Sequence, residues 1–198
     1  MRDKKDNKKK WMGILVAGII VFSMIISIFA IVVDNQSQTT PDYKTHSFMT
    51  TNTGFKTKIN GKYFDFYNYP TDLERIPLDA SVLAKIKTGQ GMAFIFDPTD
   101  NTTDDLQYID LIRYDLQTQM DKPTYFGITE NSTKYSLPVL SCANSTAEFP
   151  LVLINISSDT SFYSSQDYPN CIIMNGKLKE LLADKDRLVY TYYGIMTP

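Results

Sequence analysis

The hydrophobic pattern opens with an uncharged apolar run over residues 11–33, directly after a lysine-rich head, 1–10. As a helix, the run would extend about 34 Å, which is enough to span a bilayer. The basic residues lie on its N-terminal side, and this asymmetry predicts a cytoplasmic head and an extracytoplasmic remainder. The length of the run favours an uncleaved signal anchor over a cleaved signal peptide.

Two features flank this predicted transmembrane helix. Small residues recur four apart within it, at Gly13/Ala17 and Ser23/Ser27. This spacing leaves homo-oligomerisation through the span open, beside ordinary membrane-helix composition. The next segment, 34–45, is polar and is interpreted as a stalk, so that residues 46–198 form the extracytoplasmic domain.

Alternation with a period of two follows in that domain. Residues 55–59 and 62–69 flank Asn60-Gly61, which is a strong signal for a tight β-hairpin. Phe64 and Phe66 share one face of the second arm and are expected in the core. The other face carries tyrosines, as does the C-terminal region, and these are candidate partner contacts beside the alternative of ordinary packing: Tyr63, Tyr67, Tyr69, Tyr190, Tyr192 and Tyr193.

The rest of the pattern alternates between strands and helices. An apolar stripe makes 104–121 the clearest helix, and a strand on each side of it predicts a parallel crossover. The C-terminal helix, 177–195, is either continuous or divided at residues 184–186. The expected class is therefore α/β, with α+β as the alternative. The other expected elements are helix 80–87 and strands 91–96, 124–129, 151–156 and 171–174.

The distribution of charge argues against one class of partner, nucleic acid. The head has six basic and two acidic residues, and the whole chain has a formal net charge of −2, so the remainder carries −6. An acidic domain argues against nucleic acid as a partner. The single histidine, His46, lies next to the predicted stalk, which makes a catalytic triad or a histidine zinc site a poor explanation.

The two cysteines, Cys142 and Cys171, both follow the predicted span. In an oxidising compartment such a pair indicates a disulfide, and two free buried thiols are the alternative. The bond would close a loop of 30 residues, worth about 3–4 kcal/mol in the chain-entropy model. Five glycosylation sequons lie on the same side and fit a glycosylated exterior: Asn35, Asn101, Asn131, Asn144 and Asn155.

One loop offers a metal hypothesis. The segment 97–105 is rich in oxygen donors suited to Ca²⁺ and follows a predicted strand. The alternative is turn and helix-cap chemistry, which explains every residue of the loop without a metal. The candidate ligands are Asp97, Asp100, Asp104 and Asp105. No other cofactor is expected.

The order of elements over 91–195 resembles the thioredoxin fold, and Pro150 stands where that family has a proline, usually cis, ahead of its third strand. Residues 97–103 occupy the place of the family's Cys-x-x-Cys pair and contain no cysteine, so ordinary dithiol exchange is not implied. The overall plan, with Cys142, Pro150 and Asn170-Cys171-Ile172, is similar to uncharacterised single-pass archaeal envelope proteins. That likeness implies a location and no activity.

These observations predict a membrane-anchored, extracytoplasmic interaction module of the cell envelope, non-catalytic and with a protein partner. The alternative is a thioredoxin-like, membrane-tethered redox or assembly factor that uses Cys142 and Cys171 reversibly.

Overall fold

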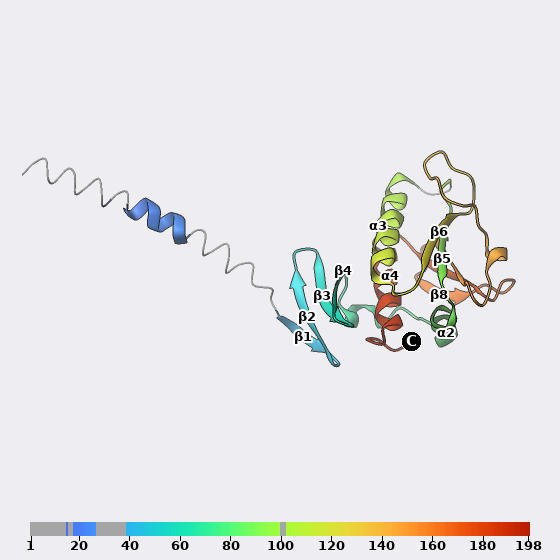
Figure 1. Ribbon diagram of the computed structural model, residues 1–198, viewed down its shortest axis with the longest axis horizontal. Helices are drawn as coiled ribbons and strands as arrows, with labels where there is room; N and C mark the ends of the chain where they lie inside the picture. The colour runs from blue at the N-terminus through green and yellow to red at the C-terminus, as the bar shows by residue number, and fades with distance from the viewer. Residues whose placement is uncertain (1–14, 16–17, 27–38, 100–101) are drawn as a thin grey trace, which may run out of the picture. The chain divides into compact units, whose positions relative to one another are not determined.

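The computed structural model describes residues 15, 18–26, 39–99 and 102–198. The chain divides into two compact units, Met1–Gln38 and Thr39–Pro198. The second unit contains two β-sheets and three α-helices (Figure 1). It is therefore a mixed α/β unit, as the alternating pattern predicts.

The predicted membrane anchor requires a correction. Most of 11–33, all of the head and residues 34–38 lie outside the described residues, and the described helical stretch of the span covers only 18–26. No helix in the described part of the chain is long and apolar enough to cross a membrane. This finding contradicts the transmembrane helix, the single-pass extracytoplasmic localisation and the membrane partnership, including association through the span.

The first sheet is antiparallel, in the order β1-β2-β3-β4. The predicted hairpin is confirmed, since Asn60 and Gly61 have positive φ values of 50° and 86° between paired Ile59 and Lys62. Phe64 and Phe66 are buried as expected. Residues 39–43, placed in the stalk by their polar composition, instead form an edge strand. The bounds are β1 Thr39–Tyr43, β2 His46–Thr51, β3 Gly54–Ile59 and β4 Lys62–Phe66.

The second sheet has five strands in the order β6-β5-β7-β9-β8. The first four are parallel to one another, and β8 runs antiparallel to β9. The predicted crossover from β5 through α3 to β6 is confirmed. Strand β8 was not predicted, because Ser-Phe-Tyr-Ser carries too short an alternation. The bounds are β5 Met92–Phe96, β6 Thr124–Ile128, β7 Leu151–Ile156, β8 Ser161–Ser164 and β9 Cys171–Gly176.

Side-chain caps satisfy the free N–H groups at the start of α2 and α3. The third helix, α4, has no side-chain cap and begins shortly after β9. The Asp79 carboxylate caps α2 (Ala80–Thr88), and a Thr102/Asp105 capping box starts α3 (Thr103–Gln119). The C-terminal helix α4 (Lys179–Tyr192) is continuous through 184–186. Two 3₁₀ turns complete the elements, η1 (Pro70–Leu73) and η2 (Cys142–Asn144).

Buried charges on α4 connect the segment that follows β4 to α3 and α4. The Asp186 carboxylate Oδ2 accepts hydrogen bonds from Tyr67 N, Asn68 N and Asn68 Nδ2, each at 2.9 Å. Lys185 Nζ lies 2.6 Å from Asp186 Oδ1 and 3.1 Å from Asp115 Oδ2. Lys185 and Asp186 are fully buried. Because removing one partner would leave a buried charge unpaired, this network fixes how the hairpin sheet sits on α3 and α4.

Two details of the structure differ from the thioredoxin-like expectation, which was based on the order of elements and on Pro150. No peptide bond among the described residues is cis, so the bond before Pro150 is trans. The described part of 97–103 has no cysteine, as in the sequence, and β8 adds a strand that the expected order lacks.

Candidate binding surface

The two faces of the five-stranded sheet are covered very differently. Met92, Phe94 and Phe96 of β5 belong to the main core, which also contains buried residues from α2, α3 and α4. The opposite face forms a separate small cluster of Ala93, Ile95, Leu151 and Cys171, to which no α-helix contributes. Parallel strands are normally covered on both faces. Among the residues that the structure describes, one face of this sheet therefore lacks its usual helical layer.

The connection 129–150 covers part of the helix-free face. Helices α3 and α4 lie on one side of the sheet and this connection runs on the other (Figure 1). Leu140 and Cys142 pack against the small cluster, and Val139 pairs with Ile128 at the end of β6. The predicted disulfide is confirmed and joins Cys142 to the fully buried Cys171, with a Cα–Cα distance of 5.2 Å. The bond holds the connection against the first residue of β9.

Beyond the disulfide, the same face continues as two rows of side chains, in which Asn175 is buried and the others are partly or fully exposed. Register places Leu153 of β7 beside Ile173 of β9, and Ile173 beside Tyr163 of β8. Leu153 and Ile173 are partly exposed and Tyr163 is 47% exposed. The next row is polar and is defined by two hydrogen bonds, Asn155 Nδ2 to Asn175 Oδ1 at 2.8 Å and Asn175 Nδ2 to Ser161 Oγ at 3.2 Å. We call these six residues the open sheet face: Leu153, Asn155, Ser161, Tyr163, Ile173 and Asn175.

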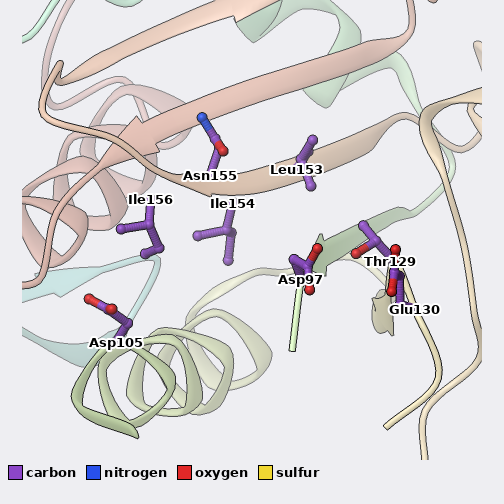
Figure 2. Close-up of a pocket in the computed structure, with 8 residues that line it drawn as sticks. All are labelled: Asp97, Asp105, Thr129, Glu130, Leu153, Ile154, Asn155 and Ile156. Atoms are coloured by element: carbon purple, nitrogen blue, oxygen red, sulfur yellow. The ribbon is translucent and has the colours of Figure 1, made fainter. Parts of the chain in front are cut away.

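A crevice of about 440 Å³ borders this face between the carboxyl ends of β5 and β7. The chain leaves β5 towards β6 on one side and leaves β7 towards β8 and β9 on the other, so the crevice lies at the switch point where open α/β sheets bind ligands. Asp97, Thr129 and Glu130 gather on one side of it and Asp105 lies across from them (Figure 2). The full lining is Asp97, Asp105, Thr129, Glu130, Leu153, Ile154, Asn155 and Ile156.

The crevice has a negative electrostatic character, because the described lining has three carboxylates and no lysine, arginine or histidine. Asp105 is buried and serves the helix cap, where its Oδ2 accepts from Thr102 Oγ1 at 2.6 Å and Thr102 N at 3.2 Å. Asp97 Oδ1 accepts from Thr99 N and Thr99 Oγ1, each at 2.7 Å. Such a crevice favours a cationic group.

For the predicted Ca²⁺ loop, the structure brings Asp97 and Asp105 to the crevice and leaves Asp104 exposed in the first turn of α3. Asp100 lies outside the described residues. No group of three or more acidic, histidine or cysteine side chains is arranged to hold a metal ion in the described part of the chain. Calcium binding stays a prediction, and the cap geometry accounts for Asp105.

The predicted tyrosine contacts do not form one exposed face. Tyr63 is 59% exposed, whereas Tyr190 is fully buried and stacks on Phe66 with ring centroids 4.0 Å apart. Tyr67 and Tyr69 pack against the core, and burial together with Asp115 raises the pKa of the Tyr67 hydroxyl to about 12. Tyr192 and Tyr193 are also partly buried, and their hydroxyls form hydrogen bonds within the domain: Tyr192 donates to Asp121 and Tyr193 donates to Gln119 O.

The sequons fall into three groups. Asn131 and Asn144 are exposed. Asn155 is also exposed but lies within β7, where its amide nitrogen donates to Asn175. Asn35 and Asn101 lie outside the described residues. Glycosylation stays a prediction.

Sequence reasoning did not find the open sheet face, because its residues come from three strands whose order and register are not local properties. A usable signal was the unbroken apolar run of β7, Leu-Val-Leu-Ile, which indicates a strand that is apolar on both faces. Comparison with protein-family models, with curated proteins and with solved structures gives no match for this chain. Its function is therefore inferred from the geometry.

Proposed function

We propose that the chain is a protein-interaction module, non-catalytic, which binds a partner protein on the open sheet face. The single observation that carries the proposal is the missing helical layer on one side of a parallel sheet. A partner that covered Leu153, Ile173 and Tyr163 would supply that layer and remove apolar surface from water. Scattered apolar side chains need no explanation, but these three are adjacent by register on neighbouring strands.

Charge complementarity indicates the chemistry of the partner. The row of Asn155 and Asn175 follows the apolar row on the open sheet face. Asn155 also lines the crevice, together with the carboxylates of Asp97 and Glu130. A matching surface carries apolar side chains beside a lysine or arginine, whose cation would lie against these carboxylates. Binding of this kind weakens as salt rises, because the rim charges are screened.

Position-specific photo-crosslinking tests the proposal. A photoreactive phenylalanine analogue replaces Tyr163 on the open sheet face or, as the matched control, Tyr114 on α3, which is 67% exposed. In cells of the source organism, we expect an adduct of one defined size from position 163 and none from position 114. Equal adducts at both positions, or none at 163, would contradict the proposal.

Reconstitution with the crosslinked partner, once identified, adds the energetic test. Tyr163→Ser and Glu130→Gln alter exposed side chains. Tyr163→Ser should weaken binding about tenfold or more, as expected for a central aromatic contact. Glu130→Gln should reduce the salt dependence of the affinity. Unchanged affinity for Tyr163→Ser would rule out the open sheet face as the binding surface.

A further inference from the structure

A second cavity, of about 300 Å³, shares no residue with the open sheet face or its crevice. It is formed by the turn between β1 and β2, by η1 and its flank, by α4 and by residues 196–198. The residues used in the argument are Tyr43, Lys44, Glu74, Arg187, Met196 and Pro198. The inference drawn from it is independent of the proposed function.

Arg187 is a buried cation that forms no close ion pair among the described residues, although the Glu74 carboxylate acts on it electrostatically from the same cavity. The side chain is 4% exposed. Its Nε donates to Ile76 O at 3.0 Å, and its Nη1 donates to Thr191 Oγ1 at 3.1 Å. Among the described residues, Nη2 has no acceptor and no carboxylate lies within 4.0 Å of the guanidinium. A buried charge normally has an ionic partner, because its desolvation is costly.

The contrast with Lys185, two residues earlier on α4, is direct. Lys185 is equally buried, and two carboxylates neutralise it at 2.6 and 3.1 Å. The carboxylate that lines the cavity with Arg187 is that of Glu74. Glu74 Oε1 instead accepts a hydrogen bond from Tyr43 Oη at 3.1 Å. The guanidinium therefore faces a cavity where an anion would complete its coordination.

We propose that this cavity binds a small organic carboxylate, held by the Arg187 guanidinium with Lys44 as a second cation. A planar carboxylate matches the fork of an arginine better than a spherical ion does. Arg187 and Lys44 supply two cations to the lining and Glu74 supplies one carboxylate, and Pro198 also lines the cavity, so the site favours a singly charged anion over a phosphate dianion. The volume lies at the low end of ligand cavities, and buried Met196 offers an apolar wall to the rest of the ligand.

A substitution of Lys44 can test the proposal without disturbing the fold. The lysine is exposed, and its φ of 54° lies in the left-handed region, which asparagine tolerates, so Lys44→Asn removes the charge with little strain. Lys58→Asn is the matched control, since both lysine Nζ atoms lie over a tyrosine ring, at 5.4 Å for Lys44 and 5.8 Å for Lys58. Lys58 is outside the cavity.

The experiment titrates the full chain with acetate, propionate and benzoate, and with phosphate and chloride at equal ionic strength. Calorimetry and the shift of the thermal midpoint report binding. We expect saturable binding of a carboxylate to the unchanged chain and to Lys58→Asn, and a loss of affinity of about two- to fivefold in Lys44→Asn. Arg187→Lys, if its melt shows a folded protein, should bind more weakly still.

Three results would overturn the proposal. One is the absence of any carboxylate effect beyond that of chloride at equal ionic strength. Another is an equal affinity of Lys44→Asn and Lys58→Asn for the carboxylates. The third is a phosphate effect as large as that of the carboxylates, which would show an unselective attraction of anions to this surface.

Discussion

Replacing Asp184 by asparagine should stabilise the protein at neutral pH. Asp184 is fully buried in α4, and neither of its carboxylate oxygens has a hydrogen-bond partner among the described residues. The side chain lies against the backbone of Gly176, where an added Cβ would be 2.4 Å from Asp184 Oδ2. Burial, with a smaller effect from Glu180, raises the pKa of the Asp184 carboxyl to about 8. The group is therefore neutral in the folded protein at pH 7.

The sign and size of the effect follow from proton linkage. The unfolded chain releases the Asp184 proton near its ordinary pKa of 3.8, whereas the folded protein keeps it until about pH 8. The stability contributed by this difference is complete below pH 3.8, and it falls by about 1.4 kcal/mol per pH unit until it is lost above about pH 8. At pH 7 the accumulated loss is about 4 kcal/mol. Asparagine keeps the shape and avoids this loss, so a gain of about 2–4 kcal/mol is expected at pH 7, less any cost of its unpaired amide.

Urea unfolding of both proteins from pH 5 to pH 9 measures the difference. The advantage of Asp184→Asn should be near 1–2 kcal/mol at pH 5 and increase to its full value by about pH 8. Asp104→Asn, an exposed change in the first turn of α3, serves as the control and should shift stability by at most about 1 kcal/mol, through the helix dipole. A variant less stable than the parent at pH 7, or a difference independent of pH, would refute the reasoning.

Two further predictions concern the buried charges and the disulfide. Lys185→Met should lower the free energy of unfolding by about 3–5 kcal/mol, because two carboxylates lose their buried cation. The control, Lys56→Met, breaks a far more exposed pair with Asp65 and should lower the free energy of unfolding by under about 1 kcal/mol. Equal losses for the two variants in urea titrations would contradict the interpretation. The double change Cys142→Ser and Cys171→Ser should lower stability by about 3–4 kcal/mol and lower the thermal midpoint, whereas an unchanged midpoint would show that the bond contributes nothing.

Local chemistry accounts for the elements that the sequence determined alone. The Asn60-Gly61 pair supplies the positive φ values of the hairpin turn. The apolar stripe of α3 is buried, and its capping box uses Thr102 and Asp105, which are three residues apart. Each of these signals involves neighbours along the chain, so its outcome depends little on the rest of the fold. The disulfide was predicted from an even pair of cysteines placed in an oxidising compartment; the bond is confirmed, although the membrane topology that placed them there is wrong.

Only the tertiary structure determined that residues 184–187 are buried and that the residues of the open sheet face lie side by side. A run of four charged residues indicates a solvated face or a break, yet all four are buried within a continuous helix. The reason is that the partners of Asp186, at Tyr67 and Asn68, lie 119 and 118 positions away in sequence. In the same way, Leu153, Ile173 and Tyr163 become neighbours only through the strand order β7-β9-β8. Sequence periodicity reports which side of an element is buried, and long-range pairing decides what lies against it.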